Sequence, residues 1–137
     1  MVDVHNQKTR SYNMSQIKGK NTKPEIVVRK FLFANGFRFR LHSKKLPGKP
    51  DIVLPKYKMA IFINGCFWHG HEGCRYFVVP QTRTEWWINK IVQNRQTDSE
   101  NYTKLTALGW KVITIFECKL KKEFREVTLN ELITNIY

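Results

Sequence analysis

Ten consecutive residues hold most of the side chains in this sequence that can bind a transition metal. The segment GCFWHGHEGC, at residues 65–74, contains Cys66, His69, His71 and Cys74, and the third cysteine of the chain, Cys118, follows a distant apolar run. Three thiolates with one imidazole form a common closed zinc set. His71 is nearer to Cys74 and lies between two glycines, so we expect Zn²⁺ to be held by Cys66, His71, Cys74 and Cys118. The alternative is three unrelated buried thiols.

The zinc hypothesis leaves the other large side chains of this segment unexplained. A closed zinc site has no open coordination position and therefore does no chemistry. The imidazole of His69 titrates near neutral pH and suits a general base, although a single histidine is more often structural. Phe67 and Trp68, like the pair Trp86–Trp87, are either packed in the core or available as wedges that unstack DNA bases.

Carboxylates elsewhere in the sequence suit a metal-dependent nuclease. Asp51 follows the turn LPGKP and opens an apolar run, which is where Mg²⁺-dependent nucleases place a metal ligand. Asp98 interrupts the apolar face of a predicted helix and can orient an imidazole. Each has an ordinary alternative, because aspartate is common in turns and Asp98 can pair with Arg95. Glu25 has one too, since it would complete a capping box with Thr22.

The elements that must position these residues follow from hydrophobic periodicity. A helix is predicted from about residue 23 to 35, ending at Gly36, and another over 84–108, ending at Gly109. FRFRL (37–41) alternates as a half-buried strand, whereas DIVLP (51–55), KMAIFING (58–65) and WKVITIFEC (110–118) are nearly continuous apolar runs. Leu129, Leu132, Ile133 and Ile136 predict a C-terminal helix. This order predicts an α/β/α sandwich with a central mixed sheet.

Composition restricts the partners. Lys and Arg number 24 against 11 for Asp and Glu, a net charge of +13, so nucleic acid is the first candidate partner. The alternative is incidental binding, because phosphate contacts carry no sequence information.

No apolar run reaches the roughly 18 residues of a membrane span, and the N-terminus resembles no secretory signal, so we expect a reducing compartment and no membrane partner. We expect a DNA-contacting arm over residues 1–21 and a single domain over 22–137.

Taken together, the motifs resemble the very-short-patch repair (Vsr) DNA mismatch endonucleases. The resemblance extends from about Asp3 to Leu120 and rests on segments that occur in order: TRSYNMSQIKGKNTKPE (9–25), LPGKPDIV (46–53), IFINGCFWHGHEGC (61–74), PQTRTEWWINKI (80–91) and GWKVITIFEC (109–118). It implies a monomeric, restriction-endonuclease-like fold in the bacterial cytoplasm, associated with the nucleoid. The implied reaction is nicking of duplex DNA on the 5′ side of the thymine in T:G mismatches, which arise when 5-methylcytosine deaminates.

The resemblance also implies roles for individual residues. Asp51 becomes the Mg²⁺ ligand, together with the backbone carbonyl of Ile63, and His69 the general base. Glu25 and Asp98 occupy supporting acidic positions, and the Cys and His set named above becomes the zinc site. The implied DNA contacts are the intercalating aromatics and further residues of the arm, strand and helix: Met14, Asn64, Phe67, Trp68, Trp87, Lys90 and Asn94.

The sequence departs from the family pattern at three places and leaves other functions open. Asn64 stands where some members have histidine, Ile63 where some have threonine, and Thr97 where an arginine is frequent. One alternative is a restriction-type nickase or nuclease that acts on paired DNA, and another is a non-catalytic, zinc-stabilised DNA-binding module. A mismatch-repair partner protein, the flanking sequence and the cognate methyltransferase are not determined by these residues.

Overall fold

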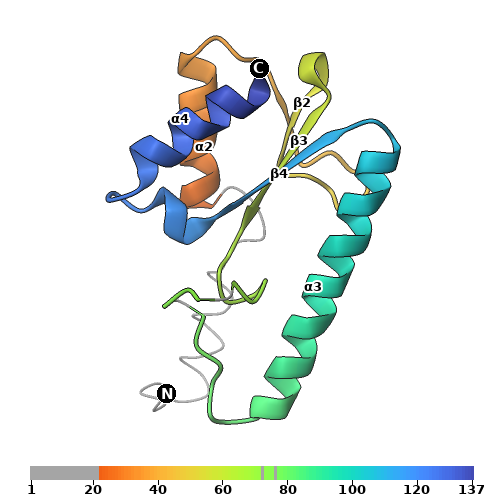
Figure 1. Ribbon diagram of the computed structural model, residues 1–137, viewed down its shortest axis with the longest axis vertical. Coiled ribbons are helices and arrows are strands. Elements are labelled where there is room, and N and C mark those ends of the chain that lie inside the picture. Colours follow the sequence, from red (N-terminus) through yellow and green to blue (C-terminus); the bar gives the residue numbers. More distant parts are fainter. Residues whose placement is uncertain (1–21, 72, 76) are drawn as a thin grey trace.

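The structure is a computed structural model that describes residues 22–71, 73–75 and 77–137 (Figure 1). The proposed arm over residues 1–21, with Met14, lies outside the described residues. In chain order the elements are α2 (Lys23–Ala34), β1 (Arg40–Leu41), β2 (Ile52–Leu54), β3 (Met59–Asn64), α3 (Thr84–Ala107), β4 (Lys111–Phe116) and α4 (Arg125–Ile136), with short 3₁₀ turns at Pro55–Tyr57 and Glu117–Leu120. The order predicted from periodicity is confirmed.

The strands form one mixed four-stranded sheet, as predicted. Its order is β1-β2-β3-β4, in which β1 and β2, and β2 and β3, are antiparallel, whereas β3 and β4 are parallel. Alternate residues of the central strand β3 face opposite sides. Met59 and Ile61 pack into a core that includes residues of α2 and α4, whereas Ala60 and Phe62 pack against Leu105 of α3. Helices therefore cover both faces of the sheet (Figure 1).

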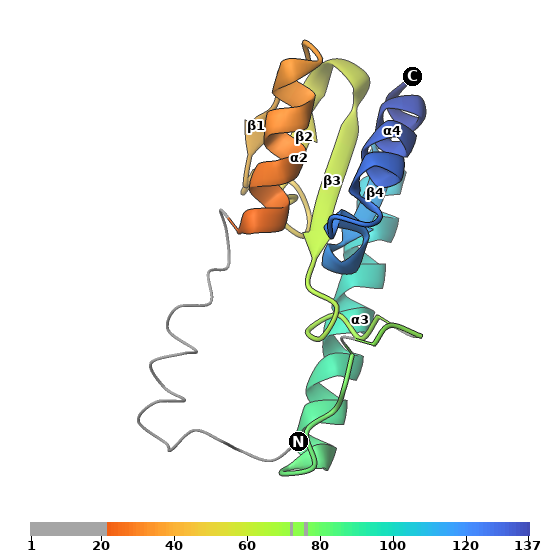
Figure 2. The same cartoon turned by 90° about the vertical axis from the view of Figure 1, so that its left-hand side faces the viewer.

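Helix α3 extends beyond the strands of the sheet. In both views its first half extends past the end of β3, and the segment that follows β3 runs beside it (Figures 1 and 2). The parallel pairing of β3 with β4 requires a crossover connection, and this segment with α3 supplies it. The segment after β3 is thereby brought between the end of the sheet and the helix.

Two local predictions need correction. The predicted strand 37–41 is reduced to Arg40–Leu41, the two residues that pair with Val53 and Ile52 of β2. Phe37 is instead anchored in the core, 4% exposed. Thr22 makes no side-chain capping bond at the start of α2, which begins with the backbone bond from the Ile26 N–H to the Thr22 carbonyl. The Thr22 half of the predicted capping box is therefore missing.

None of the helices in the described part of the chain has the length and apolar character needed to cross a membrane.

Candidate active site and metal centre

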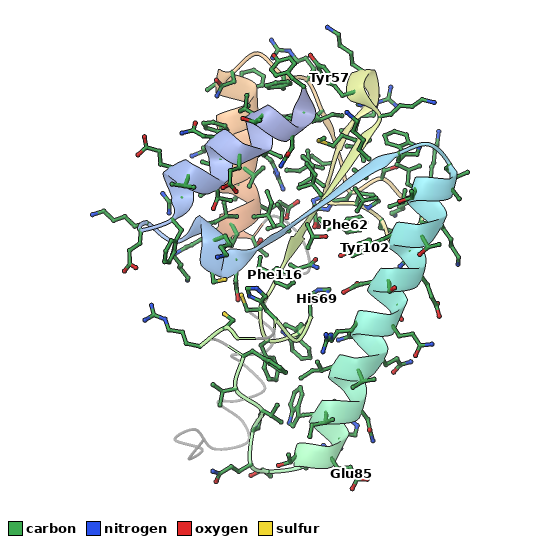
Figure 3. The ribbon with its side chains drawn as sticks, viewed as in Figure 1. Tyr57, Phe62, His69, Glu85, Tyr102 and Phe116 are labelled. Carbon is green, nitrogen blue, oxygen red and sulfur yellow. The ribbon has the colours of Figure 1, made fainter. Side chains whose placement is uncertain are left out.

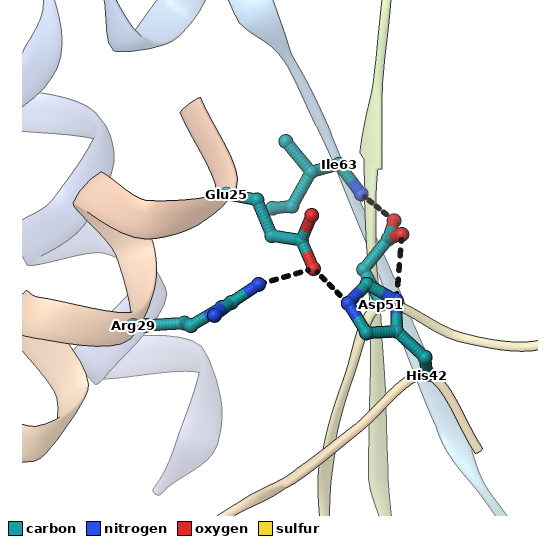
Figure 4. Close-up of polar contacts among 5 residues, drawn as sticks. All are labelled: Glu25, Arg29, His42, Asp51 and Ile63. Carbon is teal, nitrogen blue, oxygen red and sulfur yellow. Dashed lines mark hydrogen bonds and ion pairs between the residues drawn. The ribbon is translucent and has the colours of Figure 1, made fainter. Parts of the chain in front are cut away.

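Asp51 is fixed at the junction of a tight turn and the sheet. The Lys49 N–H donates to the Leu46 carbonyl (3.1 Å), which closes the turn, and Gly48 and Lys49 both have left-handed backbone there. The Ile63 N–H of β3 then donates to Asp51 Oδ2 (2.7 Å; Figure 4). Burial raises the pKa of Asp51, and the Ile63 N–H opposes that rise. The carboxylate is thus held in one orientation at the edge of the core.

Glu25 reaches the same place from helix α2. It is 2% exposed, and its Oε1 accepts from Arg29 one turn further along the helix (3.1 Å). The same oxygen lies 2.8 Å from His42 Nε2, and His42 Nδ1 lies 4.0 Å from Asp51 Oδ1 (Figure 4). A carboxylate this deeply buried needs charged or hydrogen-bonding partners, and the guanidinium of Arg29 and the His42 imidazole are placed to serve as them.

A cavity of about 510 Å³ joins these carboxylates to the segment after β3. Its lining includes residues from the start of α2, the turn before β2, the end of β3 and the loop: Glu25, Asp51, Ile63, Phe67, Trp68 and His69. Two acidic groups, one imidazole and two large aromatics therefore share one hollow. Carboxylate oxygens beside an imidazole are what a metal-assisted hydrolysis needs.

Helix α3 holds the imidazole of His69. Its Nδ1 lies 2.5 Å from Asp98 Oδ2, and both side chains are half-buried. Figure 3 shows His69 on the side of the loop that faces α3. A carboxylate at Nδ1 fixes the proton on that nitrogen and leaves the Nε2 lone pair available to accept a proton. The interpretation of Asp98 as an orienting group therefore fits the geometry.

The loop is attached to α3 at further points. Asn94 Nδ2 donates to the Trp68 carbonyl (2.9 Å), and Gly70 lies against Ile91 and Arg95 so closely that an added Cβ would be 2.6 Å from Ile91 Cγ2. At the other end of the loop, the Cys66 N–H donates to Glu117 Oε1 (3.2 Å). These contacts determine where the ring of His69 lies relative to the carboxylates.

The four predicted zinc ligands are brought together. The ligand atoms of Cys66, His71, Cys74 and Cys118 all lie within 4.8 Å of one another, and Cys118 Sγ is 3.4 Å from His71 Nδ1. The ring of His71 stacks on Phe116 (3.9 Å between centroids, 5° between planes). Burial raises the pKa of Cys66 to about 12, and it also raises that of Cys118. Three unrelated thiols would not converge in this way, and a tetrahedral metal ion fits this donor set.

The aromatic residues of the loop and of α3 form one cluster. Phe67 lies 5.3 Å from both Trp68 and Trp87, and Trp68 lies 5.6 Å from Trp87, measured between ring centroids. Trp86 packs on Trp87 at 4.7 Å and is 45% exposed. The aromatics are thus neither fully buried in the core nor isolated, and two of them, Phe67 and Trp68, line the cavity that holds the carboxylates.

The remaining predicted DNA contacts have different surroundings. Lys90 is exposed on α3. Asn64 is 5% exposed and its Nδ2 donates to the Tyr102 hydroxyl (3.2 Å), while Asn94 binds the loop as described. Ile63 is half-buried, and the contact the structure shows is that of its N–H with Asp51.

Sequence reasoning missed two residues of this site. His42 contacts both carboxylates, and Glu117 lines the cavity. A signal for His42 was available: it ends a predicted strand that a short turn connects to Asp51, so antiparallel pairing would bring the two residues together. Nothing in the spacing of Glu117 indicates its contact with Cys66.

Comparison with known proteins gives consistent matches. Residues 2–75, more than half of the chain, match the family described as DNA mismatch endonuclease Vsr. A type II nicking enzyme of Neisseria meningitidis is 47% identical over 99% of this chain and 97% of its own length. A type II nicking enzyme of Xanthomonas oryzae is 46% identical over 88% of each chain. The DNA mismatch endonuclease Vsr of Escherichia coli is 42% identical over 98% of this chain and 84% of its own.

Proposed function

The chain belongs to the Vsr family of DNA mismatch endonucleases and is a DNA endonuclease, and from that premise we propose that it nicks duplex DNA 5′ of the thymine in T:G mismatches. The observation that carries this proposal is the shared cavity of Glu25, Asp51 and His69, with Asp98 behind the imidazole. Phe67 and Trp68, which line this cavity, are suited to contact a distorted duplex. The proposed source of the T:G mismatches is the deamination of 5-methylcytosine.

The proposed reaction is hydrolysis of one phosphodiester bond. His69 accepts a proton from the attacking water at Nε2, and Asp98 stabilises the imidazolium that forms. Asp51 and the carbonyl of Ile63 are the proposed ligands of Mg²⁺, which supplies Lewis-acid activation of the scissile phosphate. The Ile63 N–H keeps Asp51 Oδ2 in place, so that Oδ1 can serve a cation. Glu25 supports this arrangement from the buried side.

The aromatic cluster is the proposed mismatch reader. Phe67, Trp68 and Trp87 contact one another, and Phe67 and Trp68 line the proposed catalytic cavity. Aromatic wedges between bases require unstacking, which costs least at a mismatched step. Lys90, Asn64 and Asn94 are proposed to contact the same DNA, and the arm around Met14 to contact its minor groove.

Zinc is the proposed metal of the Cys66, His71, Cys74 and Cys118 cluster. The cluster joins both ends of the catalytic loop to the end of β4, so a structural ion there would hold the loop rigid. We expect about one tightly bound Zn²⁺ per chain, which His71→Ala removes and His69→Ala, two residues away, retains. Metal analysis of both variants tests this expectation. Full zinc content in His71→Ala would show that His71 is not a ligand.

The remaining features of the proposal concern the whole protein. The family relationship and the mixed sheet with helices on both faces support a restriction-endonuclease-like fold. We further propose that residues 22–137 form one endonuclease domain, that the protein acts as a monomer, and that it works on DNA in the bacterial cytoplasm.

The deciding experiment is a nicking assay on two labelled duplexes that differ only in a T:G or a C:G pair. The flanking sequence is randomised, and each duplex is tested with Mg²⁺ and without it. The expected result is Mg²⁺-dependent cleavage of the thymine strand in the T:G duplex alone. Asp51→Ala is expected to abolish cleavage while the protein still binds the mismatch, and full activity of Asp51→Ala would overturn the proposed mechanism.

A second candidate is a nickase for paired DNA, which the name of the Neisseria relative, a type II nicking enzyme, makes worth testing. Equal cleavage of the T:G and C:G duplexes in the same assay would favour it. The non-catalytic binding module does not fit a member of an endonuclease family.

A further inference from the structure

His42 occupies a place in the active site to which no role has yet been given. It comes from the end of β1, whereas Glu25 comes from α2 and Asp51 from the start of β2. The ligand atoms of these three residues lie within 4.8 Å of one another. The His42 side chain is 23% exposed, so one edge of the ring remains accessible from the solvent side.

The backbone fixes His42 beside Asp51. The His42 N–H donates to the Asp51 carbonyl (3.1 Å), which continues the pairing of β1 with β2 by one residue. His42 has a φ of +49°, a left-handed conformation that costs most residues energy, although histidine adopts it more often than most. This backbone takes His42 out of the strand, and its ring lies between the two carboxylates (Figure 4).

Each nitrogen of the His42 ring faces a different carboxylate. Nε2 lies 2.8 Å from Glu25 Oε1, a short contact that is bent away from good hydrogen-bond geometry. Nδ1 lies 4.0 Å from Asp51 Oδ1, too far for a hydrogen bond. Because the Ile63 N–H occupies Asp51 Oδ2, it is Oδ1 that faces the ring.

The gap between Nδ1 and Oδ1 fits one cation. Two ligand atoms that bind the same ion at about 2.1 Å are roughly 3.0 Å apart when adjacent and 4.2 Å apart when opposite. The observed 4.0 Å is close to the separation of two opposite ligands. A metal-binding histidine almost always directs its other ring nitrogen at a carboxylate, which sets the tautomer and the ring orientation. Glu25 is in that position, and Arg29 holds Glu25.

We propose that His42 Nδ1 and Asp51 Oδ1 bind the same catalytic divalent cation, with Glu25 orienting the imidazole. This inference rests on the proposed metal-dependent nicking and deepens it by adding a nitrogen ligand. One imidazole in an otherwise oxygen-lined site favours first-row transition-metal ions over Mg²⁺, and Mn²⁺ is the one among them that also suits carboxylate ligands. The site would therefore accept Mg²⁺ and bind Mn²⁺ more tightly.

The test places Mn²⁺ in the protein after its Cys and His cluster has been filled with Zn²⁺. Pulsed electron paramagnetic resonance of the complex with a T:G duplex is expected to show nitrogen bound directly to Mn²⁺. His42→Gln should abolish that coupling and weaken Mn²⁺ binding by about tenfold or more, with a smaller effect on Mg²⁺. His69→Gln, which changes the histidine that lines the cavity, is the matched control and should retain the coupling.

Other outcomes contradict the proposal in distinguishable ways. Mn²⁺ that binds the wild type without nitrogen coupling, or a coupling that survives in His42→Gln, overturns the role of His42 and leaves metal-dependent nicking intact. Failure of the wild type to bind any divalent ion at this site contradicts both. His42→Asn is the second variant if His42→Gln does not fold, and the coupling in wild type with ¹⁵N-labelled histidine needs no substitution.

Discussion

At the scale of single residues, the site is a set of polar groups, each held by a neighbouring group of the protein. Asp51 is held by the N–H of Ile63, Glu25 by Arg29, and His69 by Asp98. A reacting group that is fixed in this way loses little entropy at the moment of reaction. The partners should therefore matter for the rate nearly as much as the groups they hold.

The contact of Asp98 with His69 gives a direct prediction. Asp98→Asn keeps the size of the side chain but no longer stabilises an imidazolium or selects the tautomer with hydrogen on Nδ1. The nicking rate should fall by about 10²- to 10⁴-fold while mismatch binding stays within a fewfold. Single-turnover kinetics and an anisotropy titration measure the two quantities. Glu100→Gln, which changes an exposed residue of the same helix, is the control and should leave the nicking rate nearly unchanged. An unchanged rate in Asp98→Asn would exclude general-base catalysis by a His69 that Asp98 orients.

Asp51 should make the stability of the metal-free protein depend on pH. Burial raises its pKa above the usual 3.8, so the native state favours the protonated carboxyl. The stability this contributes is fully present below pH 3.8 and is lost as the pH rises through the native-state pKa. Asp51→Asn removes the ionisation and should raise Tm at pH 7 by roughly a few degrees.

Thermal melts with and without Mg²⁺ check this expectation. The advantage of Asp51→Asn should shrink towards pH 4 in metal-free buffer. With Mg²⁺ at neutral pH the wild type should have the higher Tm, because the ion stabilises the wild type and does not bind Asp51→Asn. Equal Tm values for the two proteins at every pH would mean that the buried carboxylate is not a source of destabilisation.

At the scale of elements, the catalytic loop is held between β3, α3 and β4. The cysteine and histidine cluster joins it to the end of β4, and Asn94, Asp98 and the close approach of Gly70 join it to α3. The loop carries Phe67, Trp68 and His69, the proposed wedge residues and general base, together. A shift of the loop against α3 should therefore impair recognition and chemistry at the same time.

Gly70 is the position at which that contact can be tested. Its φ is +58°, and an added Cβ would lie 2.6 Å from Ile91 Cγ2. Gly70→Ala should lower the free energy of unfolding by about 2–4 kcal/mol, which combines left-handed strain with overpacking. Nicking should fall as well, because His69 is the preceding residue.

Gly73→Ala is the matched control for this substitution. Its φ is +74°, but an added Cβ would meet nothing within 4 Å. It should cost only about 1 kcal/mol, from backbone strain alone. Urea melts and nicking rates of both variants make the comparison. If the two variants behave alike, the steric contact with α3 is unimportant and the strain accounts for the whole effect.

At the scale of the whole molecule, we expect the positive charge to provide affinity for DNA and the aromatic cluster to provide discrimination of mismatches. The net charge of +13 favours any duplex, whereas the cluster of Phe67, Trp68 and Trp87 is uncharged and can respond only to how easily bases separate. Affinity and discrimination should therefore depend on different conditions.

Salt separates the two contributions. Between 50 and 200 mM salt, the affinity of the inactive Asp51→Asn variant for DNA should fall by about 10³-fold or more if its basic residues neutralise several phosphates. The ratio of T:G to C:G affinity should change by much less, because stacking releases no counterions. Fluorescence anisotropy at several salt concentrations measures both. A ratio that collapses together with the affinity would assign mismatch recognition to charge.

How far the sequence alone leads can be seen in particular residues. The element order follows from local periodicity, and the cysteine and histidine cluster from residue types, because two of the three cysteines flank glycines and histidines in one loop and the third follows an apolar strand. Asp51 was predictable because a turn and an apolar run fix it at a strand end. The pairing of His69 with Asp98 was predictable only as one alternative beside an ion pair with Arg95.

Tertiary structure alone decided the rest. Glu25 reads as a capping residue until α2 is packed against the sheet, where its carboxylate meets His42. The length of β1 depends on its pairing with β2, and the inward contacts of Asn64 and Asn94 depend on the position of α3. Periodicity and residue type act over a few neighbouring residues. These contacts instead join residues 11 or more positions apart, so strand register and helix packing set them.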